Sequence, residues 1–119
     1  MKKASFHGSI DYRFGEWGPS YLMTDEDFEM GIVRIRPGDA LPNHFHEHCD
    51  ETFIVVEGSC TLWINQETEV ALQAGDIVSS EPGEQHHLRN DGNEDCRFIF
   101  IKTPASPGDT INVGWEPAL

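Results

Sequence analysis

The sequence predicts an all-β domain, a sandwich or barrel built from many short strands. Eleven Gly and seven Pro interrupt the 119 residues frequently, so the segments between them are short. These segments have the length of strands, and several are rich in β-branched and aromatic residues. The total length suits one domain spanning residues 1–119, without room for a second core.

The expected strands follow one another between recognisable turns. Gly, Pro, Asn and Asp occupy the connections, because these residues favour the backbone conformations of turns. The turns are expected at Pro37–Asp39, Asn65–Glu67, Ala74–Asp76 and Pro82–Gly83. The strands expected around them are Phe28–Arg36, Thr52–Val56, Cys60–Ile64, Val70–Leu72, Ile77–Val78 and Arg97–Lys102.

The segment Thr24–Asp27 has two interpretations. Its first and last residues resemble a helix capping box. A hairpin turn between Tyr21–Met23 and Phe28–Ile35 is favoured, because no apolar period of 3.6 residues follows. The first ~20 residues are expected to hold strand and turn. The tail Pro104–Leu119, with three Pro and two Gly, is expected to run as an extended chain around the body.

Composition excludes several classes of function. Asp and Glu number 21 against 8 Lys and Arg, a net charge of −13. This excess repels a phosphate backbone, so no nucleic-acid partner is expected. No apolar run approaches the ~20 residues of a membrane span, and no apolar stretch follows the two N-terminal lysines, so neither a membrane partner nor a signal peptide is expected. The three cysteines lack a C-x-x-C pair, which favours a cytoplasmic location.

Five of the six histidines lie in two clusters, and a Gly-Asp turn precedes each cluster. His44 and His46 point to the same face of a strand, where an imidazole pair can chelate a divalent metal. Strict alternation adds His48 as a third ligand. A turn at residues 47–50 instead resets the alternation and lets Glu51 face inward. Periodicity alone leaves both alternatives open. The two similar Gly-Asp turns could bring the first cluster and the second, His86–His87, to one place.

Two stretches of sequence resemble the motifs of a known family. Residues 38–58, GDALPNHFHEHCDETFIVVEG, contain Gly, five residues, His-x-His, four residues, Glu, six residues and Gly. Residues 75–90, GDIVSSEPGEQHHLRN, carry Gly75, Gly83, His86 and Asn90. The stretches resemble the first and second cupin motifs, although Glu81 stands where the second motif has Pro. The chain is therefore similar to a small single-domain cupin.

The resemblance implies a double-stranded β-helix, a jelly-roll-like cupin barrel with a metal inside. It also implies that His44, His46, Glu51 and His86 are the metal ligands. Three imidazoles and one carboxylate suit a divalent metal such as Zn, Fe, Mn, Ni or Co, and positions left open by the protein can take a small-molecule substrate. His48 and His87 are then bystanders or support the ligands. Small cupins commonly pair, so a homodimer is expected.

Three functions are compatible with this resemblance, because cupins include both enzymes and binding proteins. The first is an isomerase, epimerase or lyase that uses the metal as a Lewis acid on a sugar-derived or hydroxy- or keto-acid metabolite. The second is an Fe(II)-dependent dioxygenase of a small chelating substrate, and the third is a non-catalytic barrel that binds a small ligand. In an enzyme, the candidates for acid–base catalysis are His48, Gln85 and Arg34.

Overall fold

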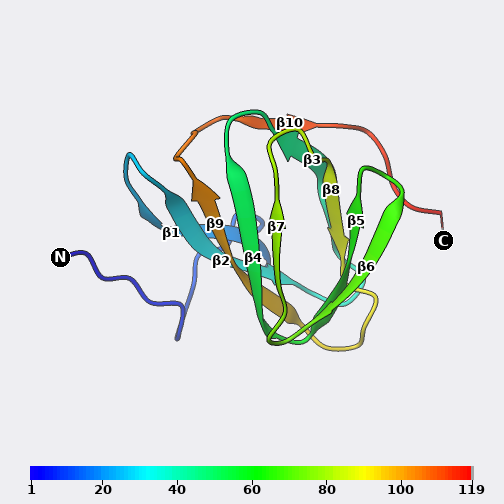
Figure 1. The fold of residues 1–119 in the computed structure, drawn as a ribbon. Helices are drawn as coiled ribbons and strands as arrows, with labels where there is room; N and C mark the ends of the chain where they lie inside the picture. The colour runs from blue at the N-terminus through cyan, green and yellow to red at the C-terminus, as the bar shows by residue number, and fades with distance from the viewer. Residues whose placement is uncertain (119) are drawn as a thin grey trace.

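Ten strands form two antiparallel sheets in the computed structural model of this chain, which describes residues 1–118 (Figure 1). The first sheet has the order β1-β2-β9-β4-β7 and the second the order β10-β3-β8-β5-β6. The strands are β1 (Gly18–Thr24), β2 (Glu29–Ile35), β3 (Ala40–His46), β4 (Asp50–Glu57), β5 (Ser59–Ile64), β6 (Thr68–Gln73), β7 (Ile77–Ser80), β8 (His86–Arg89), β9 (Cys96–Thr103) and β10 (Thr110–Asn112). The predicted all-β class is confirmed. Within the described range, no helix is long and apolar enough to cross a membrane.

The segment with two interpretations is a hairpin turn, as favoured. Strands β1 and β2 pair in antiparallel fashion on either side of it. The carboxylate of Asp25 accepts hydrogen bonds from the backbone N–H groups of Asp27 and Phe28, at 2.8 and 3.2 Å. The side chain thus satisfies the turn's own donors, which is the usual role of Asp in a tight connection.

The two ends of the chain differ in their secondary structure. Before β1, the structure holds turns and an isolated bridge between Tyr12 and Gly15, so the expected strand begins only at Gly18. The C-terminal tail runs along the outside, as expected, but it also adds the short strand β10 to the edge of the second sheet (Figure 1). This strand pairs with β3, which brings the tail beside His44 and His46.

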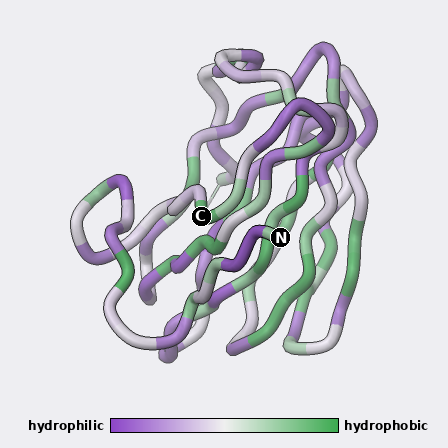
Figure 2. The backbone as a smooth tube through the Cα atoms, turned by 90° about the vertical axis from the view of Figure 1, so that its left-hand side faces the viewer, coloured by the Kyte–Doolittle hydropathy of each residue, from purple (hydrophilic) through white to green (hydrophobic). Residues whose placement is uncertain are grey.

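The core lies between the two sheets. Inward-facing residues alternate with outward-facing ones, and strand β9 buries Cys96, Phe98 and Phe100 in this way. Along the backbone tube, hydrophobic and hydrophilic stretches accordingly alternate (Figure 2). Both sheets contribute to one cluster of buried apolar residues: Val33, Ile35, Phe53, Val55, Cys60, Leu62, Leu72, Leu88, Cys96, Phe98 and Phe100.

Gly31 allows two aromatic rings to meet at the inner face of the first sheet. It lies in register between Tyr21 on β1 and Phe100 on β9. A Cβ at this position would lie 2.0 Å from the carbonyl oxygen of Ser20 and 2.9 Å from the Phe100 ring. Without that Cβ, the Tyr21 and Phe100 rings contact edge to face, with centroids 4.9 Å apart.

The inward row of the first sheet nearest the β3–β4 turn is polar instead of apolar. Glu29, Lys102, Glu51 and Ser80 follow one another across β2, β9, β4 and β7 in register. All four residues are more than nine-tenths buried. Buried charges of opposite sign next to one another are typical of a functional site, because an isolated buried charge is costly.

Candidate metal centre

Strand pairing brings the two histidine clusters together. Strands β3 and β8 are antiparallel neighbours, and His44 on β3 is the register partner of His86 on β8. The two imidazole rings contact edge to face, with centroids 4.3 Å apart. The prediction that the Gly-Asp turns lead both clusters to one place is confirmed.

The turn after β3 decides which side chain joins these histidines. Strand β3 ends at His46, and β4 resumes after three residues, so the alternation is reset and Glu51 faces inward. The Nε2 atom of His46 lies 3.0 Å from Oε1 of Glu51. His48 points outward instead, with 71% of its side chain exposed. Of the two alternatives that periodicity left open, the structure shows the one with Glu51.

His44, His46, Glu51 and His86 form one compact cluster whose ligand atoms all lie within 4.8 Å of one another. Backbone carbonyls orient two of the rings: Nδ1 of His44 donates to Pro42 at 2.7 Å, and Nδ1 of His86 donates to Glu84 at 3.2 Å. A neutral ring that donates through Nδ1 has only a lone pair at Nε2.

This lone pair makes the cluster well suited to a cation. Nε2 of His86 lies 3.0 Å from the Glu51 carboxylate, so two acceptors face each other when the neutral ring carries its proton on Nδ1. A cation bound between Nε2 of His86 and the Glu51 carboxylate would be attracted to both acceptors. Metal-binding histidines typically donate their other N–H to a backbone carbonyl, as His44 and His86 do here. The cluster could therefore hold a divalent metal.

The electrostatics of the cluster favour its metal-binding protonation states. Burial by itself raises the pKa of Glu51, but the imidazoles of His46 and His86 and the charge of Lys102 outweigh burial and hold the pKa well below its usual value. Burial and the neighbouring His86 lower the pKa of His44 to about 4. At neutral pH, the carboxylate is therefore ionised and the His44 ring is free of its second proton.

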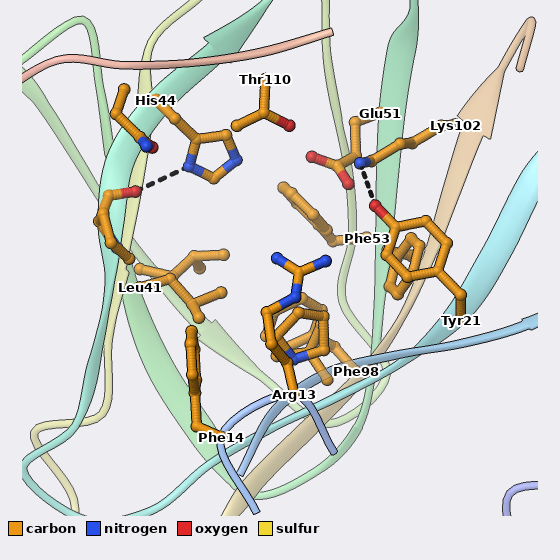
Figure 3. A pocket seen from close by; sticks show the side chains of 16 residues that line it. Arg13, Phe14, Tyr21, Leu41, His44, Glu51, Phe53, Phe98, Lys102 and Thr110 are labelled. Atoms are coloured by element: carbon orange, nitrogen blue, oxygen red, sulfur yellow. Dashed lines mark hydrogen bonds between the residues drawn. The ribbon is translucent and has the colours of Figure 1, made fainter. Parts of the chain in front are cut away.

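The cluster opens into a pocket of about 390 Å³ through His44 and Glu51 (Figure 3). Much of the pocket wall is apolar, with Leu41, Phe53 and Phe98 among the labelled side chains. The polar residues of the wall are Arg13, Tyr21, Lys102, Thr110 and Asn112. None of these five residues was predicted from the sequence as a site residue.

A signal for one of these residues does exist in the sequence. Lys102 continues the alternation Cys96, Phe98, Phe100 on β9, so its side chain must face inward like theirs. A lysine on the buried side of a strand is unusual enough to mark a site. Arg13 and Tyr21 carry no comparable signal, because both residues are exposed.

The three sequence candidates for acid–base catalysis lie outside this pocket. His48 is exposed beside Glu47, at 3.7 Å. Arg34 forms an ion pair with Asp95 at 2.7 Å. Gln85 accepts hydrogen bonds from the side chains of Asn43 and Gln66, at 2.9 Å each. None of the three lines the pocket, and their role in catalysis stays a prediction.

His87 is not part of the cluster either. Its ring is buried between Trp63 and Trp115, with centroid distances of 5.7 and 5.8 Å. Alternation along β8 turns it away from His86, so it lines a separate cavity of about 210 Å³ beneath the C-terminal tail.

Comparison with known proteins gives several matches. A tetracenomycin polyketide synthase protein of Streptomyces glaucescens is 30% identical over 89 residues, which are 74% of this chain and 59% of that protein. Quercetin 2,3-dioxygenase of Bacillus subtilis is 34% identical over 70 residues, 59% of this chain and 20% of the enzyme. The chain thus spans less than two thirds of the length of each of these relatives.

Solved structures share the fold. A protein of Klebsiella pneumoniae with a double-stranded β-helix domain superimposes with a TM-score of 0.78, covering 88% of this chain and 92% of that one at 24% identity. The predicted double-stranded β-helix is thereby confirmed. The sequence model of the cupin domain family matches residues 31–102, more than half of the chain and including all four clustered side chains. The chain therefore belongs to the cupin family.

Proposed function

We propose that this chain is a metal-dependent enzyme that acts on a small oxygenated metabolite bound in the pocket. The observation that carries this proposal is the position of the four-residue cluster at the end of the pocket, with His44 and Glu51 facing the cavity. When bound there, a divalent cation supplies Lewis acidity that polarises a carbonyl or stabilises an enolate. A lyase or isomerase reaction needs no more from the metal than this.

The protein's own residues prepare the cluster for that chemistry. The carbonyl of Pro42 accepts a hydrogen bond from Nδ1 of His44, so the neutral ring keeps a free lone pair at Nε2 for a metal. The carbonyl of Glu84 does the same for His86. Glu51 adds the negative charge that three neutral imidazoles lack. The ring of Phe53 packs against His86 with centroids 5.6 Å apart and excludes water from that side.

The lining of the pocket narrows the class of metabolite. Apolar side chains from both sheets form much of its wall, and most of the labelled polar groups lie near His44 and Glu51 (Figure 3). A sugar needs hydroxyl partners along its whole length, whereas a hydroxy or keto acid with an apolar body needs them at one end. We therefore favour the hydroxy- or keto-acid class. The similarity to a polyketide synthase protein supports a keto-bearing substrate.

A second candidate function is an Fe(II)-dependent dioxygenase. The similarity to quercetin 2,3-dioxygenase favours it, and it uses the same four residues. Ligand type alone does not separate the two candidates, because imidazole and carboxylate suit iron as well as zinc, manganese and nickel.

Metal analysis of the untagged protein tests the proposal. We expect about one divalent metal per chain, retained in His48→Ala and lost in the double variant His46→Ala/His86→Ala. His48 is a matched control because it is exposed and only two residues from a cluster histidine. A metal-free wild type that also resists reloading contradicts the proposal.

Turnover assays separate the candidates. The metal-loaded protein is incubated with a panel of hydroxy acids, keto acids and diketones while oxygen consumption and product formation are recorded. A product without oxygen uptake supports Lewis-acid chemistry, and substrate-dependent oxygen uptake by the iron-loaded protein supports the dioxygenase. A compound that stabilises the fold but is recovered unchanged supports a non-catalytic binding barrel.

A further inference from the structure

Lys102 is a buried cation that the metal cluster does not use. Lys102 is only 8% exposed, yet it forms no ion pair with any carboxylate of residues 1–118. An ammonium group carries three N–H donors, and within that range only the Tyr21 hydroxyl accepts one of them, at 2.6 Å. Buried charged groups are normally paired or fully hydrogen-bonded, so this lysine lacks acceptors on its pocket side.

Arg13 is a second cation without a carboxylate partner. The four other arginines all form ion pairs: Arg34 with Asp95, Arg36 with Asp39, Arg89 with Asp91 and Arg97 with Glu57. In a chain with 21 acidic residues and only 8 Lys and Arg, an arginine left unpaired among the described residues stands out. Arg13 instead lies against the Tyr21 ring, 5.8 Å from its centroid, and lines the pocket (Figure 3).

Tyr21 joins the two cations into one wall. Its hydroxyl oxygen accepts the hydrogen bond from Lys102, so its own proton remains available for another acceptor. Tyr21 lines the same pocket, between Arg13 and Lys102 in the view of Figure 3. Three different donor groups therefore line one pocket together with His44 and Glu51.

We propose that Arg13, Tyr21 and Lys102 form an anion subsite, and that the substrate places a carboxylate there while its remaining oxygen atoms lie against His44 and Glu51. The second half of this statement rests on the proposed metal-dependent function. The first half rests on the three donors alone. Arginine and lysine donors hold carboxylates through charge-assisted hydrogen bonds, and the carboxylate supplies the acceptors that Lys102 lacks.

The charges around the pocket agree with an anionic ligand. Lys102 and Arg13 contribute two positive charges, and Glu29 and Glu51 contribute two negative ones. A bound dication leaves this region positive, although the chain as a whole carries a charge of −13. A positive pocket in an acidic protein attracts anions locally and raises their concentration at the site.

Matched pairs of probes test the subsite by isothermal titration calorimetry. Lactate is compared with lactamide, and mandelate with mandelamide, because each pair differs in charge and hardly in shape. We expect the zinc-loaded protein to bind the acids at least ~10-fold more tightly than the amides. The variant Arg13→Gln should lose ~5–10-fold in affinity for the acids and little for the amides.

Controls separate this inference from the proposed function. Arg36→Gln removes an arginine that is paired with Asp39 and lies outside the pocket, so it should leave both affinities unchanged. The zinc affinity of Arg13→Gln should equal that of the wild type. Lys102→Gln should weaken acid binding further, and Tyr21→Phe provides a milder change at the same place if that variant does not fold.

The outcomes are distinct. Equal binding of acids and amides, no acid binding at all, or equal losses in Arg13→Gln and Arg36→Gln overturn the anion subsite. If the wild type binds no zinc, the proposed function fails by itself. The same probes are then titrated into the metal-free protein, where a preference for the acids that depends on Arg13 supports the subsite and its absence overturns it.

Discussion

Replacing Glu51 with Gln tests the reasoning about the metal centre most directly. The change keeps the shape of the side chain and removes its charge. Glu51 is buried, and its Oε1 atom lies 3.0 Å from Nε2 of both His46 and His86. It is also the register neighbour of Lys102 across β4 and β9. The substitution therefore affects both metal binding and the stability of the metal-free protein.

The expected size of each effect follows from these contacts. A hydrogen bond to a charged partner contributes ~1.5–3 kcal/mol, and Nε2 of His46 can donate one to Glu51. Removing the carboxylate also removes its desolvation penalty, which offsets part of the loss. We expect the free energy of unfolding to fall by ~1–3 kcal/mol and Tm by ~4–12 °C. Metal affinity should fall at least ~100-fold, because even partners that only support a ligand are worth 10–100-fold.

Zinc affinity is measured by competition with a chelator, and stability by urea unfolding of the metal-free protein. Glu69→Gln is the matched control, because Glu69 lies on β6, is exposed and forms no ion pair among the described residues. It should leave both quantities within error of the wild type. Zinc affinity in Glu51→Gln within threefold of the wild type would refute the assignment of Glu51 as a ligand.

Three further predictions concern pH, packing and assembly. Because the pKa of His44 is lowered to about 4, the unfolded metal-free chain binds more protons than the folded one between about pH 6.5 and 4. Urea unfolding should therefore show the free energy of unfolding falling by ~2–3 kcal/mol as pH falls through that window. A free energy of unfolding that does not change there contradicts the environment described for His44. Gly31→Ala places a Cβ 2.0 Å from the Ser20 carbonyl oxygen and should cost ~2–4 kcal/mol in thermal unfolding, whereas Gly114→Ala meets no atom within 4 Å and should be near neutral. Light scattering should give twice the chain mass of 13.4 kDa if the homodimer expected from the family resemblance forms, and a single-chain mass refutes it.

Local sequence patterns were sufficient for the strands and their turns. Runs of β-branched and aromatic residues between turn signals placed strands β4, β5 and β9 to within a few residues, because such residues favour strands and turn residues end them. Asn65 and Gln66 form the expected turn with positive φ values of 50° and 64°. The short strand β10 was missed, because three residues in an extended tail carry no periodic signal.

The candidate ligand set was accessible from sequence only through the cupin motifs. Periodicity by itself left His48 and Glu51 as alternatives, since it does not show where a strand stops. The structure decides between them because β3 ends at His46 and the turn resets the alternation before Glu51. The side of the strand on which a residue falls depends on that single break.

The proposed anion subsite depends on the tertiary structure alone. Arg13, Tyr21 and Lys102 come from the N-terminal loop, β1 and β9, and they meet only because β1, β2 and β9 are neighbours in one sheet. Arg34, a candidate from sequence, is instead paired with Asp95 outside the pocket. The sequence by itself determined the fold class, the turns and, through the motifs, four clustered side chains, since these depend on local spacing. Which cations face the cavity depends on bringing together residues up to 89 positions apart, and only folding does that.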